Sequence, residues 1–598
     1  MEHIPFQARK EYHKSPFGAL QRGTELTLRV VVPRAWGCSA ARVLFGRDGE
    51  ELSPYPMLWE RMEGENEEWW CVSLGGEKPT GLYRYRFECD LAQGPWSIGA
   101  GEGARGVWGG EDCFPLTIYD EEYQAPEWLL GGVIYQIFPD RFCASGKQKQ
   151  GVPRDRLLRG DWGGEPLAEP IRTGEEQPES YDFFGGDLAG ITKKLPYLHS
   201  LGVSCVYLNP IFEANSNHRY DTADYSKIDS LLGTEEDFRT LCERAREQGI
   251  AVVLDGVFSH TGADSVYFNR SGRYGAGGAY RDVNSPYRGW YKFGDYPHGY
   301  RSWWGVDILP ELREEERTYI DFIAGEEGIA RKWLRLGASG WRLDVADELP
   351  DCFLDSFAAA VKREKPDCYL LGEVWEDASD KISYGQRRRY LQGKQLDSVM
   401  NYPLARAILA FALGEEGCAE RLAECYESLC EHYPPRALNL AMNHIGTHDT
   451  IRALSLLGGA ELDGRRAMPL TREQRRLALT RLKTAAVLQY CLPGLPCVYY
   501  GDEAGLEGGL DPFNRGCFPW GEEDAELTEH YRALGKMRRE HRELFASAPC
   551  GILQACGGKI CFERRGKTEL MRVSVTTGSE PSYEITFTPK GDDGNEGA

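Results

Sequence analysis

Four acidic residues lie at or just after the ends of short apolar runs, a placement that could bring their carboxyl groups together. They are Asp255, Asp344, Glu373 and Asp449. The sequence has no Cys/His cluster with metal-ligand spacing, so the carboxyl groups themselves would carry out the chemistry. Cleavage of a glycosidic bond needs such a set. One group attacks the anomeric carbon, one protonates the leaving oxygen, and a third interacts with the substrate as charge develops.

Arg342 and Asp344 fall on one face of a predicted strand, because side chains alternate along a strand. The guanidinium favours the ionised form of Asp344 and is expected to lower its pKa, as a nucleophile requires. Taken alone, this pair could equally be a salt bridge that closes the end of the strand. Glu373 has the apolar sequence neighbours Leu371 and Trp375, which favour a carboxyl group that keeps its proton near neutral pH, as an acid catalyst requires.

Eight apolar segments with helical patterns between them would position these groups. This alternation predicts an α/β fold, a (β/α)₈ TIM barrel, whose reacting groups lie at the C-terminal ends of the strands. An open doubly wound sheet is the alternative, although no Gly-rich dinucleotide-binding loop follows the first strand. The predicted strands cover residues 133–137, 203–208, 251–255, 340–344, 368–374, 397–402, 440–448 and 495–500, and the predicted helices include 235–248, 317–336 and 472–489.

A different pattern precedes and follows the barrel. Alternating segments separated by Gly and Pro predict an N-terminal β-sandwich over residues 1–125. The barrel would cover residues 126–546, ending in a helix over 526–545. A short C-terminal β-domain would cover 547–598, with 591–598 disordered. Four Trp residues of the sandwich could be core residues or a sugar-stacking face: Trp59, Trp69, Trp70 and Trp96.

Two long insertions interrupt the barrel pattern. Residues 143–183 are polar and Gly-rich, and we expect a mobile loop near the mouth of the barrel. Residues 260–316 follow the third strand and are rich in Tyr, Trp, Gly and Asp. This second insertion predicts a subdomain that forms a wall of the pocket, since long aromatic loops are usually functional.

The charge balance and the cysteines exclude several kinds of protein. The 92 acidic residues against 70 Lys and Arg give a net charge of −22, which disfavours nucleic-acid or anionic-membrane partners. No apolar run resembles a signal peptide or a membrane span. The 18 Cys residues contain no CxxC pair and predict reduced thiols. We therefore expect a cytoplasmic location.

Four motifs resemble the α-amylase family, glycoside hydrolase family 13. They are DGVFSH (255–260), GWRLDVADE (340–348), GEVWED (372–377) and GTHDT (446–450). The segments GVIYQIFPDRF, SNHRYDTADY and GLPCVYYGDEAGLEGGLDPFNRGCFPW support the resemblance, which runs from about residue 15 to 588. Together the motifs are very specific, whereas no single one would be.

The resemblance implies a role for each matched residue. Asp344 is expected to be the nucleophile of a retaining mechanism, Glu373 the general acid/base and Asp449 the transition-state stabiliser. Asp344 and Glu373 would then lie about 5–5.5 Å apart. Trp375 would border the acceptor side. The residues expected around the −1 sugar are Tyr220, Asp255, His260, Arg342 and His448.

Within the family, the residues after the nucleophile (345–348) resemble those of neopullulanases, cyclomaltodextrinases and amylopullulanases. The N-terminal sandwich resembles the family-34 carbohydrate-binding module of those enzymes. The resemblance implies hydrolysis of α-1,4 bonds, and in many such relatives of α-1,6 bonds, in maltodextrins, cyclodextrins or pullulan fragments. The relatives also suggest a homodimer that forms through the sandwich.

Two departures from the family pattern bear on calcium. Ser259 stands where many members have an Asn ligand, and Cys-Ala-Ser-Gly-Lys-Gln follows Phe142 where calcium-binding relatives have Asn and Asp. We therefore expect no required cofactor; calcium remains an alternative that the motif residues do not support. One alternative function is a transglycosylase resembling 4-α-glucanotransferases, because a sugar hydroxyl can also intercept the glycosyl-enzyme. A catalytically inactive glucan-binding protein is disfavoured by the presence of all three carboxylates.

Overall fold

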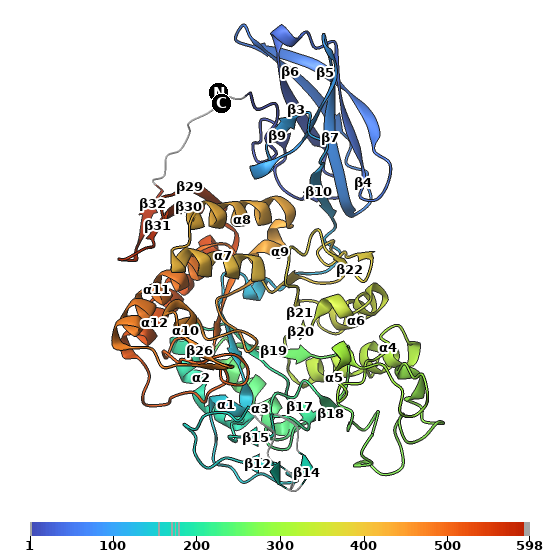
Figure 1. Ribbon diagram of the computed structural model, residues 1–598, viewed down its shortest axis with the longest axis vertical. Coiled ribbons are helices and arrows are strands. Elements are labelled where there is room, and N and C mark those ends of the chain that lie inside the picture. Colours follow the sequence, from blue (N-terminus) through green and yellow to red (C-terminus); the bar gives the residue numbers. More distant parts are fainter. Residues whose placement is uncertain (1–2, 154–155, 169–171, 174, 177–179, 591–598) are drawn as a thin grey trace. The chain divides into compact units, whose positions relative to one another are not determined.

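The computed structural model describes residues 3–153, 156–168, 172–173, 175–176 and 180–590 (Figure 1). The predicted disorder of residues 591–598, and part of the predicted loop over 143–183, lie outside these described residues. The chain divides into two compact units. The first contains Met1–Tyr123, Asp377–Leu396 and Ala423–Leu438, and the second contains Gln124–Glu376, Asp397–Leu422 and Asn439–Ala598.

The first unit is built on a curled, largely antiparallel sheet in the order β1-β3-β6-β5-β4-β7-β10-β2. Its central strand β5 pairs with β6 on one side and β4 on the other, so the two layers of the predicted sandwich are one continuous sheet. β8 and β9 extend the sheet from β7. The strands are β1 (Lys14–Ser15), β2 (Leu20–Gln21), β3 (Leu26–Pro33), β4 (Ala40–Arg47), β5 (Ser53–Glu63), β6 (Glu67–Leu74), β7 (Gly81–Leu91), β8 (Gly94–Ala100), β9 (Gly106–Trp108) and β10 (Phe114–Tyr119).

The four Trp residues of the sandwich divide between its core and its surface. Trp69 and Trp70 are 5% and 8% exposed, whereas Trp59 and Trp96 are 52% and 43% exposed. Only the second pair therefore has indole surface available to a ligand.

Eight parallel strands form the central sheet of the second unit, in the order β24-β21-β20-β19-β16-β11-β28-β25. Each strand pairs with the next along the chain, the last strand β28 pairs with the first strand β11, and a bridge between Met400 and Met442 closes the ring. The predicted barrel is confirmed. The strands are β11 (Ile134–Ile137), β16 (Cys205–Leu208), β19 (Ala251–Gly256), β20 (Gly340–Leu343), β21 (Tyr369–Gly372), β24 (Ser398–Val399), β25 (Met442–His444) and β28 (Leu495–Tyr499).

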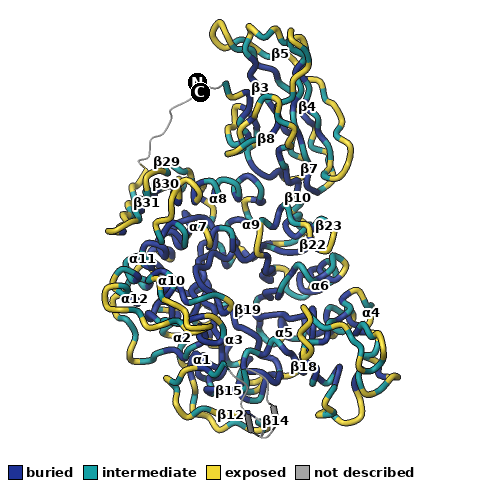
Figure 2. Tube along the Cα trace, viewed as in Figure 1, coloured by how far each residue is buried: buried dark blue, intermediate teal, exposed yellow. Residues whose placement is uncertain are grey.

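The barrel strands are buried on both faces, as expected when helices cover a parallel sheet (Figure 2). The helices are α1 (Pro139–Phe142), α2 (Leu188–Ser200), α3 (Glu235–Glu247), α4 (Arg317–Ala324), α5 (Ile329–Leu336), α6 (Asp351–Glu364), α7 (Tyr402–Leu413), α8 (Cys418–His432), α9 (Pro435–Asn439), α10 (Ala453–Leu457), α11 (Arg472–Cys491), α12 (Ala525–Glu540) and α13 (Arg542–Ser547).

Two segments predicted as single helices are each two helices in the structure. Residues 317–336 form two helices, because Gly325 ends α4 and Gly328 begins α5. Glycine loses the most backbone entropy in a helix, so two glycines three residues apart favour a break. The predicted helix over 526–545 likewise divides at His541.

The insertion over 260–316 packs as a cluster of aromatic rings connected by isolated bridges. Phe268 contacts Tyr291 and Tyr300 with ring centroids 4.8 Å apart, and bridges join Tyr291 to Leu312 and Phe293 to Tyr300. Four antiparallel strands follow α13: β29 (Cys550–Cys556), β30 (Lys559–Arg565), β31 (Glu569–Thr576) and β32 (Ser582–Pro589).

All 18 cysteines lie within the described residues and are free thiols, as predicted. Within the described parts of the chain, no helix combines the length and the apolar character that crossing a bilayer requires.

Candidate active site

The C-terminal ends of the barrel strands bring the predicted carboxyl groups to one rim. Asp255 lies in β19, Asp344 follows β20, and Glu373 follows β21. Asp344 N donates to Gly256 O at 3.0 Å and Glu373 N donates to Leu343 O at 3.0 Å, so the strand ladder continues up to the two acids. Asp449 lies in the loop after β25.

One guanidinium joins three of these carboxyl groups. Arg342 Nη1 lies 2.8 Å from Asp255 Oδ1 and 2.6 Å from Asp344 Oδ1, and Nη2 lies 2.9 Å from Glu373 Oε2. Arg342 itself is fully buried. A single positive charge can balance only one of three buried carboxylates, and unbalanced buried charge is costly. The cluster therefore favours a state in which at least one carboxyl group keeps its proton.

Burial raises the pKa of Asp344 well above its ordinary value. Arg342 opposes this increase, but nearby Glu373 and Asp255 add to it. The prediction of a lowered pKa is therefore wrong in its net direction. The reason is that Arg342 is shared among three acids and cannot offset the burial of each one. Burial also raises the pKa of Asp255, again against the effect of Arg342.

The carboxyl group of Glu373 lies among hydrogen-bond donors. Its Oε2 accepts from Val345 N at 2.9 Å, and its Oε1 accepts from Trp375 Nε1 at 3.2 Å and from Tyr402 OH at 3.3 Å. The sequence predicted apolar surroundings for this carboxyl group. Trp375 does contact it, but through its indole N–H, so the carboxyl group lies among hydrogen-bond donors and not in a purely apolar pocket.

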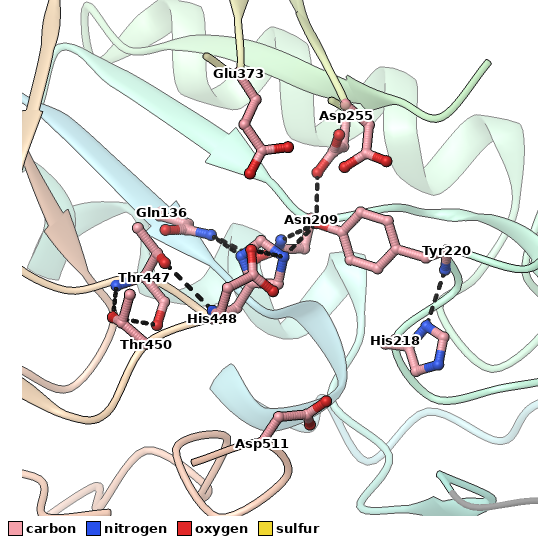
Figure 3. Close-up of polar contacts among 12 residues, drawn as sticks. Gln136, Asn209, His218, Tyr220, Asp255, Glu373, Thr447, His448, Thr450 and Asp511 are labelled. Carbon is pink, nitrogen blue, oxygen red and sulfur yellow. Dashed lines mark hydrogen bonds and ion pairs between the residues drawn. The ribbon is translucent and has the colours of Figure 1, made fainter. Parts of the chain in front are cut away.

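A row of hydrogen bonds connects Asp255, Tyr220 and His448 (Figure 3). Tyr220 OH lies 2.9 Å from Asp255 Oδ2 and 2.5 Å from His448 Nε2, and the Tyr220 and His448 rings are nearly parallel at 3°. Burial lowers the pKa of His448 well below its ordinary value, so its ring is neutral. Because Gln136 Nε2 donates to Nδ1 at 2.9 Å, the ring proton lies on Nε2 and faces Tyr220.

Asp449 is the most accessible of the three carboxyl groups assigned to catalysis. Its side chain is 33% exposed, against 8% for Asp344 and 3% for Glu373. Asp449 Oδ2 lies 3.2 Å from His448 Nε2, and Oδ1 lies 3.7 Å from Arg515 Nη2. Burial and the nearby Glu373 raise the pKa of Asp449 to about 7, whereas Arg515 lowers it.

His260 and Trp375 complete the predicted set. His260 is 1% exposed, its Nδ1 lies 3.0 Å from Ser259 Oγ, and its ring lies 4.8 Å from that of Trp303. Burial lowers the pKa of His260 to about 3, so this ring is also neutral. Trp375 is 38% exposed and stacks on Tyr402 at 4.2 Å and 12°. All nine predicted site residues thus lie at the C-terminal ends of the strands or in the loops that follow them.

Several residues at this rim were not singled out from the sequence. Gln136 in β11 and Asn209 after β16 were detectable as polar residues in or after an apolar strand, and Asn209 Nδ2 donates to Tyr220 OH at 2.9 Å. Tyr402 and Thr447 have no such signal, because Tyr and Thr are ordinary residues in a barrel. Arg515 comes from a loop after β28, far along the sequence from Asp449.

The family pattern raised the question of calcium in the loop after Phe142. In the structure, this loop contributes a positive charge, the ammonium of Lys149. The buried carboxylate of Asp187 accepts from Ser145 N at 3.2 Å, Ser145 Oγ at 2.6 Å and Gly190 N at 2.6 Å, and it pairs with the ammonium of Lys149. Calcium prefers oxygen ligands and cannot occupy a carboxylate already surrounded by N–H and O–H donors. The residues present here therefore do not fit a calcium ion. Across the described residues, no group of three or more His, Cys, Asp or Glu could hold a metal ion.

The chain is a glycoside hydrolase of the α-amylase family. The family model "Alpha amylase, catalytic domain" matches residues 136–542. An amylopullulanase from Thermoanaerobacter thermohydrosulfuricus is 36% identical over 93% of this chain and 40% of its own length. A cyclomaltodextrinase from Geobacillus thermopakistaniensis is 36% identical over 72% of this chain and 66% of its own length.

The solved structures agree with this assignment. A cyclomaltodextrinase superposes with a TM-score of 0.66 at 26% identity, covering 96% of this chain and 91% of that one. The type III pullulan hydrolase from Thermococcus kodakarensis superposes with a TM-score of 0.65 at 26% identity, covering 97% and 95%. The chain spans 30% to 44% of the length of the three amylopullulanases that it matches.

Proposed function

We propose that this chain hydrolyses α-1,4-glucosidic bonds, and α-1,6 bonds in branched substrates, with retention of configuration at the anomeric carbon. Its substrates would be maltodextrins, cyclodextrins or pullulan fragments. The observation that carries the proposal is the shared guanidinium of Arg342, which holds Asp344 and Glu373 on one rim through contacts of 2.6 Å and 2.9 Å. The similarity to cyclomaltodextrinases and amylopullulanases supports the substrate class.

In the first step, a carboxylate oxygen of Asp344 attacks the anomeric carbon while the bond from that carbon to the glycosidic oxygen breaks. The proton on Glu373 passes to the departing oxygen, which leaves as a sugar hydroxyl. The positive charge that develops on the sugar ring is stabilised by the carboxylate of Asp449. The buried network of Asp255, Tyr220 and His448 would hold the −1 sugar, because its polar groups are already oriented.

In the second step, the carboxylate of Glu373 takes a proton from water, and the water oxygen bonds to the anomeric carbon. The ester bond to Asp344 breaks, and both acids return to their starting forms. This cycle consumes one water for each bond and uses only groups that the chain supplies. We therefore infer that no cofactor is required, which agrees with the pairing of Asp187 with Lys149.

Replacement of the acid tests the proposal most directly. Glu373→Gln keeps the size of the side chain but cannot donate a carboxylic proton, so activity on maltoheptaose and pullulan should fall by at least a factor of about 100. The matched control is Glu376→Gln, because Glu376 lies in the same loop and is exposed. Activity of Glu373→Gln within a few-fold of the wild type would reject the assignment.

Product stereochemistry tests the nucleophile separately. NMR of the first products should show the α-anomer, since two displacements at the anomeric carbon restore its configuration. Initial release of the β-anomer would show a single displacement and would reject Asp344 as the nucleophile.

Transfer to a sugar acceptor is the second candidate activity. Trp375 offers an exposed indole face next to Glu373, where an acceptor sugar could stack in place of water. Product analysis at high maltose decides between the two outcomes. Longer oligosaccharides would indicate transfer, and products of hydrolysis alone would exclude it.

A further inference from the structure

Tyr402 lies beside the proposed acid, Glu373, and its hydroxyl is 3.3 Å from Oε1. It is the first residue of α7 and is 3% exposed. Its ring stacks on Trp375 at 4.2 Å and 12° and meets the edge of His444 at 4.4 Å and 75°. With an aromatic ring on each side, the phenol of Tyr402 is held in one orientation.

The two oxygens of the Glu373 carboxyl group have different partners. Oε2 faces Arg342 Nη2 and Val345 N, each at 2.9 Å. Val345 N donates a hydrogen bond to Oε2 and the positive charge of Arg342 lies beside it, so Oε2 acts as the acceptor oxygen. The proton that Glu373 gives to the leaving group must therefore be on Oε1. The neighbours of Oε1 are Trp375 Nε1 at 3.2 Å and Tyr402 OH at 3.3 Å.

These two neighbours of Oε1 differ in what they can do. The indole N–H of Trp375 can only donate, whereas the phenol of Tyr402 can donate or accept, because its O–H rotates about the C–O bond. The phenol is therefore the neighbour that can face Oε1 both before and after the proton leaves.

We propose that Tyr402 is a positioning residue for the general acid. While Glu373 carries its proton, the phenol turns a lone pair toward Oε1. After Glu373 has given its proton to the leaving oxygen, the phenol turns and donates to Oε1. The same hydroxyl thus stabilises both forms of Glu373 and holds Oε1 toward the substrate. This inference rests on the proposed role of Glu373.

The dependence of rate on the leaving group separates this role from a structural one. Maltotriose needs a proton on its leaving oxygen, whereas an aryl α-maltoside with a nitrophenol leaving group needs little acid assistance. In Tyr402→Phe we expect kcat/KM to fall about tenfold for maltotriose, the effect of losing one hydrogen bond to a reacting group. We expect it to fall less than about threefold for the aryl substrate.

The control variant is Tyr490→Phe, which removes the hydroxyl of another buried Tyr, in α11, away from the rim. It should leave both substrates unchanged. Equal losses on the two substrates in Tyr402→Phe, or no loss on maltotriose, would overturn the proposal. Replacement of Tyr402 by 3-fluorotyrosine, which keeps the ring and makes the hydroxyl a stronger donor, provides a second test if Tyr402→Phe unfolds, because an equal change on both substrates would overturn the proposal there too.

Glu373→Gln measured with the same two substrates separates this inference from the proposed function. A large loss confined to maltotriose in Glu373→Gln, together with equal losses in Tyr402→Phe, would reject only the role of Tyr402. Equal losses on both substrates in Glu373→Gln would instead reject Glu373 as the acid.

Discussion

The backbone amide of Val345 donates a 2.9 Å hydrogen bond to Oε2 of Glu373. Val345 directly follows Asp344 and has left-handed backbone angles, φ 34° and ψ 69°. Such angles are unusual for a β-branched residue and are retained only where the surroundings enforce them. The next amide, Ala346 N, donates to Glu373 O at 3.0 Å. The chain after the proposed nucleophile therefore fixes both the backbone and the carboxyl group of the proposed acid.

This relationship predicts that activity depends on the backbone N–H of Val345 more than on its side chain. Val345→Gly keeps the N–H group and adopts a positive φ without strain. We expect kcat on maltoheptaose to stay within about threefold of the wild type and the free energy of unfolding to change by less than about 1 kcal/mol. A loss of activity above about tenfold would show that the side chain itself holds the site.

The acidic limb of the pH–activity profile should report Asp449 together with Asp344, because burial raises the pKa of both carboxyl groups and both must be ionised. Burial and Glu373 raise the pKa of Asp449 to about 7, and a stabilising carboxylate must be ionised, so kcat/KM should fall as the pH decreases through about 7. Arg515 lowers this pKa, so Arg515→Met should raise it further and move the limb to higher pH. Arg515→Lys keeps the positive charge and should leave the limb nearer its wild-type position. A limb that moves to lower pH in Arg515→Met would contradict the assignment.

Chelation of divalent metals should leave the melting temperature unchanged, because Lys149 already pairs with Asp187. In Lys149→Met, a buried carboxylate would lose its cation at a cost of about 2 kcal/mol, which corresponds to a decrease of a few degrees in Tm. Lys147→Met is the matched control. Lys147 lies in the same loop, but it is 60% exposed in its pair with Asp237 and should contribute little. A decrease in the Tm of the wild type on treatment with EDTA would contradict this account.

Packing between two barrel helices depends on Gly535. A Cβ at this position of α12 would lie 1.9 Å from Leu201 O, next to the end of α2. Gly535→Ala should therefore destabilise the protein by about 1–3 kcal/mol, although Ala is intrinsically the better helix former by about 1 kcal/mol. Gly277→Ala has no atom within 4 Å of the added Cβ and should change the stability little. Thermal unfolding of both variants checks this, and an unchanged Tm in Gly535→Ala would show that the helices can move apart without cost.

The barrel and its rim could be predicted from sequence because each part is local. A short apolar run followed by a polar residue identifies both a strand and a group at its C-terminal end, as for Asp255 and Glu373. The pairing of one charged group with several others could not be predicted in this way. Arg342 was expected to pair with Asp344 alone, but it contacts three acids at the ends of three strands. Because its charge is shared, the net shift in the pKa of Asp344 is upward and not downward.

The errors in secondary structure have a similar origin. The hydrophobic periodicity continues through residues 317–336. It therefore gives no sign of the helix break that the two glycines cause. Contacts of Tyr402 with Glu373 and of Arg515 with Asp449 join residues 29 and 66 positions apart. Such pairs follow from the closure of the barrel and have no local signal.

The joint between β24 and β25 has a consequence for the reaction. β24 has two residues, and the contact that closes the ring there is the single bridge between Met400 and Met442. Every other neighbouring pair of barrel strands has two to four paired residues. We therefore expect the amides of residues 398–400 to exchange with deuterium sooner than those of the other barrel strands. Tyr402 lies two residues beyond Met400, so each transient opening of this bridge would move its phenol away from Glu373 and interrupt turnover.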